Sequence, residues 1–286
     1  MKRASDPAAG ADARIAEAQR LMEQRMGADT DVRAIATALG LSLHHFHRIF
    51  VEATGETPAG YLRRVRLDAA ALRLRWTEES VGSVALGLGY VSQPAFTRAF
   101  RRRFGCTPGQ FRAQQANGAR TAVPLASLRR VRIRELDRLT VVAKRYVGDL
   151  YAVRQYWRDF AAALPPELAS RGDGHFAGLL HDDPGLTPKG ETRYDCCLVL
   201  GSRVGEVAVP AGCDLQILET RPGRYACLQH EGCWTTVAHS YSLVCDHWLA
   251  RTRETVTDDP AIELHRIRRD LQPPDRLSFT VLIPIE

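Results

Sequence analysis

Residues 32–61 have the sequence VRAIATALGLSLHHFHRIFVEATGETPAGY, and residues 81–111 have the similar sequence VGSVALGLGYVSQPAFTRAFRRRFGCTPGQF. The chain therefore contains two copies of one sequence pattern. The two copies match at an offset of 49 ahead of Ser42 and Ser92, and at an offset of 50 from these serines onward. The second copy therefore has one additional residue in its central turn, and the copies otherwise superpose.

Each copy predicts a short helix, a sharp turn and a second helix. Ahead of the turn in the first copy, the apolar residues keep the i, i+3, i+4, i+7 spacing of an amphipathic helix, and Gly40 follows where a helix end favours a positive φ. Ser42 and Ser92 are the predicted N-caps of the second helices. The residues of these helices that we expect to be buried are Phe46, Ile49, Phe50, Phe96, Ala99 and Phe100.

A short helix, a glycine turn and a second helix that displays Arg form the pattern of a helix-turn-helix. A single copy fits an ordinary helical hairpin equally well, but two tandem copies in a basic segment favour DNA binding. Residues 12–113 resemble the DNA-binding domain of AraC/XylS-type transcriptional regulators. The most specific part of this resemblance is the end of the second copy: Gly89, Tyr90, Ser92, Phe96, Arg98, Phe100, Phe104, Gly105, Thr107, Pro108, Phe111 and Arg112.

The resemblance implies that two recognition helices enter successive major-groove segments on one face of double-stranded DNA. Residues 57–75 between the copies read as a helix of 19 residues. Such a helix is about 28 Å long at ~1.5 Å per residue, which suits a DNA turn of ~34 Å. The residues expected to contact DNA are His44, His47, Arg48, Gln93, Pro94, Thr97, Arg98 and Arg101.

These side chains suit the reading of bases, because Arg pairs bidentately with guanine and His or Gln binds purine acceptors. Pro94 replaces a polar side chain that is usual in the family, so this position is expected to contact a thymine methyl group. Three consecutive residues, Arg101, Arg102 and Arg103, splay around the helix. For these three, phosphate contact and a solvated basic face are equal alternatives.

The composition is that of an ordinary soluble protein with two domains: 286 residues, 45% hydrophobic and 25% charged. Residues 1–120 hold 18 Lys and Arg against 11 Asp and Glu, whereas the rest holds 21 against 22. The net charge of +6 therefore belongs to the N-terminal part, as phosphate contact requires. Without an apolar run of about 18 residues or a signal-peptide pattern, the sequence predicts a cytoplasmic protein that does not contact membranes.

The seven cysteines contain no C-x-x-C pair, and Cys196 and Cys197 alternate across an expected strand. Reduced, buried thiols are therefore favoured over disulfides or zinc ligands. The histidine cluster at residues 44–47 has no Cys nearby, and Glu52 is about two helical turns from His45. We expect neither a metal site nor a cofactor.

The rest of the chain predicts a linker and a second domain. Residues 1–11 are small and polar and are expected to lack regular structure, whereas residues 12–26 predict a helix that braces the first copy. Residues 114–128 lack periodicity and contain Gly, so they predict a linker. Residues 129–286 form the expected second domain.

This second domain contains another internal repeat, whose constant offset of 84 aligns Val141 with Tyr225 and Leu179 with Glu263. Each half reads as strand, turn, strand, helix and two more strands, which predicts an α+β fold of two pseudo-symmetric β-β-α-β-β repeats in an antiparallel sheet. The helices near residues 151–164 and 234–250 are expected to cover one face of the sheet or to flank a groove between the halves.

Residues 129–286 resemble the GyrI-like effector-binding domain, which implies a small-molecule site in the groove between the repeats. Glu263 stands where the family carries a Glu at the bottom of its pocket, and His265 stands where a Tyr is usual. Because the side chains of Ile262 and Leu264 point to the opposite face, Glu263 faces either the groove or solvent. The match to the family's pocket Glu and the aromatic residues expected nearby favour the groove, where burial would raise the pKa of Glu263. The residues expected to surround the effector together with Glu263 are Trp157, Tyr146, Tyr151, Trp234, Tyr241, His230 and His265.

An aromatic site with one carboxylate predicts a cationic or strongly hydrogen-bond-donating aromatic effector. The two resemblances together imply a one-component transcriptional regulator of Rob-like architecture, and not an enzyme, whose binding to DNA or contact with RNA polymerase changes with the effector. Two other classes stay open. One is a hydrolase of electrophilic small molecules that uses Glu263, His230, His265 and Tyr241 as acid–base groups, and the other is a module that sequesters a toxin or a protein partner.

Overall fold

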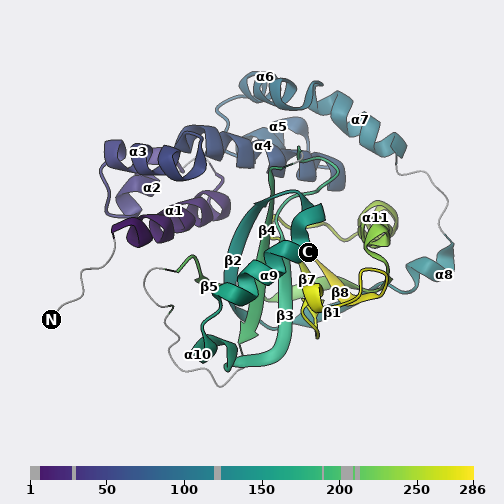
Figure 1. Ribbon diagram of the computed structural model, residues 1–286. Coiled ribbons are helices and arrows are strands. Elements are labelled where there is room, and N and C mark those ends of the chain that lie inside the picture. The colour runs from purple at the N-terminus through teal and green to yellow at the C-terminus, as the bar shows by residue number, and fades with distance from the viewer. Residues whose placement is uncertain (1–6, 28–29, 119–123, 189, 201–208, 210–212) are drawn as a thin grey trace. The chain divides into compact units, whose positions relative to one another are not determined.

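The computed structural model describes residues 7–27, 30–118, 124–188, 190–200, 209 and 213–286. The chain divides into two compact units, with the change from one to the other after Gly118. Figure 1 shows the first unit as helices and the second as a sheet with helices. Within the described ranges, no helix combines the length and the apolar character that crossing a membrane requires.

The first unit is helical, as the doubled pattern predicts. Its helices are α1 (Pro7–Gln24), α2 (Val32–Ala38), α3 (Leu43–Thr54), α4 (Pro58–Trp76), α5 (Val81–Gly87), α6 (Gln93–Phe104) and α7 (Pro108–Gly118). Ser42 and Ser92 cap α3 and α6, since their side chains accept hydrogen bonds from the backbone N–H groups of His45 and Ala95. Gly40 has a φ of 66°, as predicted for the residue that follows a helix.

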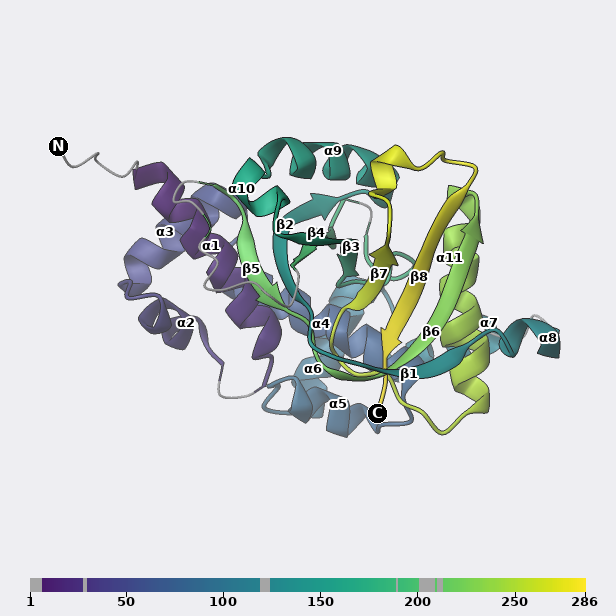
Figure 2. The same cartoon turned by 90° about the horizontal axis from the view of Figure 1, so that it is seen from below.

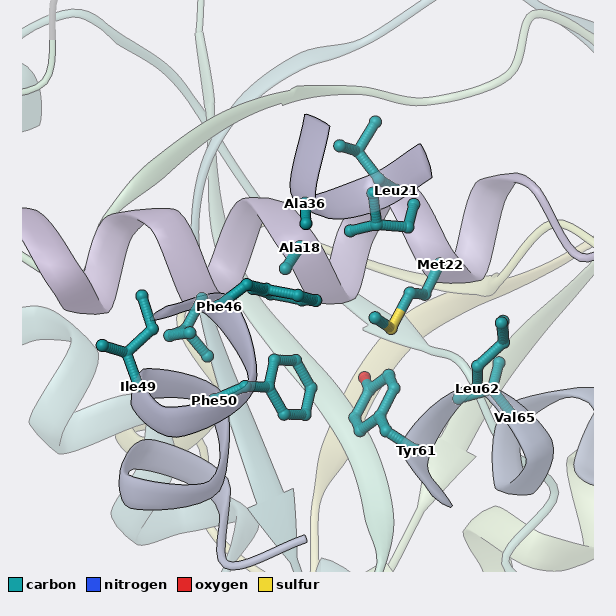
Figure 3. Packing of buried hydrophobic residues seen from close by; sticks show 12 residues of the cluster. Ala18, Leu21, Met22, Ala36, Phe46, Ile49, Phe50, Tyr61, Leu62 and Val65 are labelled. Atoms are coloured by element: carbon teal, nitrogen blue, oxygen red, sulfur yellow. The ribbon is translucent and has the colours of Figure 1, made fainter. Parts of the chain in front are cut away.

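The first helix-turn-helix has its own core, which Figure 3 shows from close by. Phe46 and Phe50 of α3 meet edge to face, and Phe50 meets Tyr61 of α4 in the same way. Met22 of α1 points into this aromatic group (Figure 3), so α1 braces the first copy as expected. Burial of this stripe leaves the other face of α3 to solvent.

The second helix-turn-helix repeats this packing. Phe96 and Phe100 of α6 are buried, and Phe100 also contacts Phe111 of α7 edge to face. Gly89 has a φ of 76° and lies against Arg66 of α4, so a Cβ at this position would be strained and would also meet the guanidinium group. Arg66 in turn donates to the backbone carbonyls of residues 26, 27 and 30, which ties α4 to the end of α1.

Two helix boundaries differ from the expectations. α1 begins at Pro7, so residues 7–11, which were expected to lack regular structure, are helical; residues 1–6 lie outside the described residues. α7 continues to Gly118, so the first five residues of the expected linker are also helical. Residues 7–11 include three Ala, and residues 114–118 include two Gln and one Ala, all residue types of good helix propensity.

The second unit alternates strands and helices in the predicted order. Its elements are α8 (Leu125–Leu128), β1 (Arg132–Leu136), β2 (Thr140–Gly148), η1 (Leu150–Ala152), α9 (Val153–Ala163), α10 (Pro166–Ala169), β3 (Gly172–Leu180), β4 (Thr192–Leu200), β5 (Gln216–Glu219), β6 (Gly223–Gly232), η2 (Trp234–Thr236), α11 (Val237–Ser242), η3 (Leu243–Trp248), η4 (Leu249–Arg251), β7 (Ala261–His265), η5 (Arg269–Leu271) and β8 (Leu277–Pro284). Both halves are therefore β-β-α-β-β units, as predicted.

The eight strands form one antiparallel sheet in the order β1-β6-β8-β7-β3-β4-β2-β5. The two halves meet where β3 pairs with β7. The first strand of each half crosses to the other half: β1 pairs with β6, and β5 pairs with β2. The two halves are thus interlocked by an exchange of strands.

The register of the sheet corrects the constant offset of 84. Ala143, Cys197 and Ala177 stand in one row across β2, β4 and β3, and Cys227, Leu282 and Ile262 stand in the corresponding row of the other half. The offset is therefore 84 for the second strand of each half but 85 for the third and fourth strands. One residue inserted between strands moves the following side chains to the other face.

The equivalent of Glu263 in the first half is consequently Gly178, and the expected equivalence with Leu179 is wrong. Gly178 and Glu263 are direct partners across β3 and β7, so they share one face of the sheet. Leu179 pairs with Ile262, and both belong to the apolar cluster on the other face. Glu263 therefore lies at the centre of the sheet, where the halves meet.

Both long helical segments lie on the face that carries Glu263. Figure 2 shows α9 beside the β2–β4 half and α11 beside β6 and β8. Trp157 of α9 contacts Phe176 of β3 and His265 of β7 edge to face, and Val244, just after α11, joins a cluster with Phe279 of β8. The strip of sheet around β7 thus lies between the two helical segments.

Candidate functional site

The residues predicted to contact DNA lie together on the exposed faces of α3 and α6. His44, His47 and Arg48 are exposed on α3, opposite its buried stripe. On α6, Thr97 is half-buried, and the exposed residues are Gln93, Pro94, Arg98 and Arg101. Each helix therefore presents a polar, partly basic face of the kind that a recognition helix lays against base edges.

Two arginines of these helices have partners within the unit. Arg48 lies 3.8 Å from Glu52 and 3.2 Å from the Nδ1 atom of His45, but all three side chains are solvent-accessible. Such an exposed ion pair is weak, so it leaves Arg48 available to DNA.

Arg103 instead donates to the buried carboxylate of Asp68 on α4, at 2.7 and 3.1 Å. Of the three consecutive arginines, Arg101 and Arg102 are exposed, whereas Arg103 is half-buried, so Arg103 belongs to an internal ion pair and neither phosphate contact nor a solvated basic face describes it.

In the second unit, Glu263 is the centre of a buried polar group. Its Oε2 atom accepts hydrogen bonds from the Arg269 guanidinium and from the Tyr194 hydroxyl at 2.8 Å. Its Oε1 atom accepts from the Tyr241 hydroxyl at 3.3 Å, and the Nε2 atom of His265 lies 3.6 Å from Oε2. We call these five residues (Glu263, Arg269, Tyr194, Tyr241 and His265) the Glu263 cluster.

The electrostatics of this cluster correct the expectation of a raised Glu263 pKa. Burial raises the pKa of Glu263, but the charge of Arg269 and hydrogen bonds from His265 and Tyr194 outweigh burial and lower it to about 2. Burial raises the pKa of both tyrosines, which therefore stay protonated and donate. Glu263 is thus an ionised carboxylate whose counter-charge, Arg269, belongs to the chain itself. The reason for expecting a cationic effector is removed.

The hydrogen-bond network fixes the proton of His265. Ser278 N–H donates to Oε1 of Gln272, so the Nε2 group of this amide is a donor, and it lies 3.4 Å from Nδ1 of His265. Nδ1 is therefore the acceptor. Because burial also lowers the pKa of His265, the ring is neutral and carries its proton on Nε2, next to Glu263.

Aromatic rings extend the cluster. The His265 ring lies between Phe279, at 4.7 Å, and Trp157, at 5.8 Å. His230 packs on the other side of Phe279 at 4.8 Å and shares a hydrogen bond of 2.8 Å with the Ser240 hydroxyl. Two of the residues predicted to bind an effector, Trp157 and His230, are therefore joined to the Glu263 cluster through rings.

Of the remaining predicted effector residues, Tyr146 is the cross-strand partner of Tyr194, whereas Tyr151 and Trp234 lie at the surface. Tyr151 of η1 and Trp234 of η2 meet edge to face at 5.3 Å, and both are exposed, by 71% and 48%. They are a surface pair and not part of the buried group. Tyr146 stacks on Tyr156 of α9 at 4.7 Å.

Two residues of this region were not assigned to the site from the sequence: Arg269 and Gly178. Tyr194 reaches Glu263 from β4 by crossing over β3 at Gly178, where any Cβ would overlap the phenol ring. This crossing depends on the order of strands, which no local pattern reports. Arg269 begins η5, close in sequence to Arg266 and Arg268, and nothing in the sequence distinguishes it from these neighbours.

The cysteines form no disulfide, and Cys196, Cys197 and Cys227 are buried in the sheet. Burial raises the pKa of the Cys196 and Cys197 thiols well above the usual value, so they are protonated and unreactive. Within the described residues, no group of three or more His, Cys, Asp and Glu side chains is arranged to hold a metal ion.

Comparison with protein families divides the chain in the same way. Residues 35–114 match the helix-turn-helix domain family, and residues 129–286, more than half of the chain, match the GyrI-like small molecule binding domain.

Curated relatives match the helical part. Regulatory protein SoxS of Escherichia coli (strain K12) is 36% identical over 91 residues, which are 32% of this chain and 85% of that protein. Transcriptional activator NphR of Rhodococcus sp. is 37% identical over 103 residues, which are 36% of this chain and 30% of that protein. An AraC-type regulator from Chromobacterium violaceum has a solved structure that is 32% identical, with a TM-score of 0.35 over 38% of this chain and 96% of its own.

A solved structure also aligns with a larger share of the chain. An uncharacterized conserved protein from Listeria innocua is 10% identical, with a TM-score of 0.40, and the alignment covers 55% of this chain and 93% of that one.

Proposed function

This chain belongs to the AraC-type transcriptional regulators that carry a C-terminal GyrI-like small molecule binding domain, and on that premise we propose how its two units act. α3 and α6 read two adjacent major-groove segments of an operator. A small molecule that binds the second unit near Glu263 changes the binding to DNA or the contact with RNA polymerase.

The observation that carries the DNA-reading part is the repetition of exposed polar residues on two equivalent, capped helices. Arg48 of α3 and Arg98 of α6 stand at the same place in the two copies, and both are exposed. An Arg at the centre of a recognition helix suits guanine, whose O6 and N7 atoms accept two hydrogen bonds. α4 joins the copies as one helix of 19 residues, which favours a fixed spacing between the two readers.

The neighbouring residues suggest how the two readers differ. His44 and His47 of α3 would bind purine acceptors, and Gln93 of α6 would do the same. Pro94 is exposed at the start of α6, where its apolar ring suits a thymine methyl group. Thr97 and Arg101 follow on the same face.

The alternative of a hydrolase loses its main support. A general base has to bind a proton near neutral pH, whereas Glu263 has a pKa of about 2. His265 is neutral, but it lies against Phe279 and Trp157 and is fully buried. The cluster is better suited to holding a ligand than to moving protons.

The test is selection of DNA by the full chain from a random pool, followed by affinity measurements on the selected operator. We expect two short motifs about one helical turn apart. Arg48→Ala and Arg98→Ala should each lower the affinity for the operator about tenfold or more and leave the affinity for random DNA nearly unchanged. Arg14→Ala, an exposed Arg of α1, is the matched control. Equal losses on operator and random DNA for Arg48→Ala would assign this residue to phosphate contact and remove the proposed reading.

A further inference from the structure

The pairing of Glu263 with Arg269 decides which charge an incoming ligand meets. The side chain of Arg269 is 11% exposed and that of Glu263 is 3% exposed, so the Arg269 side chain is the more accessible of two buried partners. Glu263 accepts from one of the five N–H donors that an Arg carries. The guanidinium can therefore donate to a second acceptor while it keeps its bond to Glu263.

One buried donor near this pair lacks an acceptor. Among the described residues, the Nε1 atom of Trp157 is buried without a hydrogen-bond partner, and this group can only donate. The Nε2 proton of His265, by contrast, already faces the carboxylate of Glu263 at 3.6 Å. Trp157 and His265 are both 0% exposed. A buried donor without an acceptor is costly, so Trp157 favours a ligand that brings an acceptor.

The acceptors of the cluster are already in use. Glu263 receives hydrogen bonds from Arg269, Tyr194 and Tyr241, which occupy both of its oxygens. A cationic ligand would have to displace Arg269 before it could pair with Glu263, because the charges of the two residues cancel while they are paired. The rings of Trp157, His265 and Phe279 form a continuous apolar wall beside the guanidinium, which lies 5.5 Å from the Phe279 ring.

From this arrangement we propose, on the basis of the effector-binding function stated above, that the second unit takes a flat aromatic ligand bearing a carboxylate or a carbonyl group. The acceptor oxygen binds the Arg269 guanidinium, and the ring lies against the aromatic wall, where Trp157 donates to a further acceptor. Glu263 does not contact the ligand. It is a positioning residue that holds Arg269.

The test uses the full chain and three probes that share one ring system: 2-naphthoate, neutral 2-acetylnaphthalene, and 2-(aminomethyl)naphthalene, which is a cation at neutral pH. Binding is measured by calorimetry. We expect the affinity to fall in the order carboxylate, ketone, ammonium. Arg269→Gln should weaken the carboxylate at least about tenfold, because a hydrogen bond to a charged group is lost, and should improve the ammonium probe by freeing Glu263.

The matched control in the same turn is Arg268→Gln, since Arg268 pairs with Asp270 outside the cluster. Trp157→Phe keeps a ring but removes the N–H donor, and it should weaken the carboxylate and ketone several-fold; Trp248→Phe is its control. Thermal unfolding of each variant identifies those that fail to fold, and Arg269→Lys, which keeps the charge, should retain most of the carboxylate affinity.

The outcomes separate the inference from the function on which it rests. Tightest binding of the ammonium probe, with a loss in Glu263→Gln, overturns the ligand class but leaves a small-molecule site in place. Binding of the carboxylate that Arg269→Gln does not change also overturns it. If none of the three probes binds the folded protein up to millimolar concentration, both the ligand class and the small-molecule site fail, while DNA selection still tests the regulator.

Discussion

Asp68 and Glu52 are both carboxylates beside an Arg of a recognition helix. Asp68 is buried and Glu52 is exposed, and this difference gives them different roles. Asp68 is 4% exposed and holds Arg103, whereas Glu52 is exposed beside Arg48. A buried carboxylate that loses its charge leaves its Arg partner unpaired, but an exposed pair is screened by water. Asp68 therefore stabilises the fold, whereas Glu52 forms only a weak, solvent-screened pair with Arg48.

We therefore expect Asp68→Asn to lower the free energy of unfolding of the helical unit by about 2 kcal/mol. The matched change Glu52→Gln should alter it by less than about 1 kcal/mol. Urea unfolding followed by circular dichroism measures both. Similar losses in the two variants would show that the Asp68–Arg103 pair is not a structural contact.

A second residue-scale prediction concerns pH. Glu263 has a folded pKa of about 2, and the pKa of Asp182 and of Asp195 is also lowered, in each case because an Arg partner outweighs burial. A carboxylate with a depressed pKa contributes stability above its unfolded pKa of about 4 and loses it as the pH falls towards the folded pKa. For Glu263 this contribution is on the order of 3 kcal/mol.

The same rule applies to His265, whose pKa burial lowers: the unfolded chain binds its proton below about pH 6.5, so stability begins to fall there. We expect the second unit to lose stability in two stages, a small one below about pH 6.5 and a larger one below about pH 4. Glu263→Gln should reduce the second stage only, as measured by urea unfolding from pH 7 to pH 2.5. A second stage of unchanged size in this variant would contradict the assigned ion pair.

At the scale of elements, hydrophobic spacing predicted the helices and strands, because the spacing records which face is buried. The N-caps at Ser42 and Ser92 and the positive φ of Gly40 followed from local chemistry in the same way. The register of β3 against β7 could not be predicted from local chemistry. A repeat aligned by similarity gives no count of inserted residues, so Leu179 was placed where Gly178 lies.

Gly178 provides a test of how β3 and β4 build the site. A Cβ at this position would overlap the Tyr194 ring, so Gly178→Ala should push the Tyr194 hydroxyl away from Glu263 and destabilise the second unit by about 1–3 kcal/mol. Gly109→Ala in α7 is the matched control, since no atom lies within 4 Å of a Cβ there, and it should have no destabilising effect. Thermal unfolding measures both variants. Equal midpoints would mean that Tyr194 does not need this crossing.

At the scale of the whole molecule, the uneven charge of the sequence predicted which part meets DNA. The affinity for DNA should fall with salt, because cationic side chains release counterions from phosphates. The double variant Arg101→Ala, Arg102→Ala should reduce the salt slope by about one for each phosphate contact removed, on operator and random DNA alike. Arg138→Ala, an exposed Arg of the second unit that pairs with Glu219, should leave the slope unchanged. An unchanged slope in the double variant would assign these two arginines to a solvated face.

Two features of the whole molecule escaped prediction for one physical reason. The exchange of β1 and β5, and the capture of Glu263 by Arg269, both join segments whose meeting depends on the order of strands in the sheet. Local periodicity carries no information on that order. The carboxylate itself could be found because Ile262 and Leu264 define the face to which it points, but its partner could not.

The exchange of strands also directs mechanical force. β1 is the first strand after the connection to the helical unit, yet it is hydrogen-bonded to β6 of the other half. Tension along that connection is therefore transmitted first to the second half, which carries β7 and Glu263, although β1 belongs in sequence to the first half. The connection between the two units is therefore linked to the half that carries Glu263 through the five residues of β1, from Arg132 to Leu136.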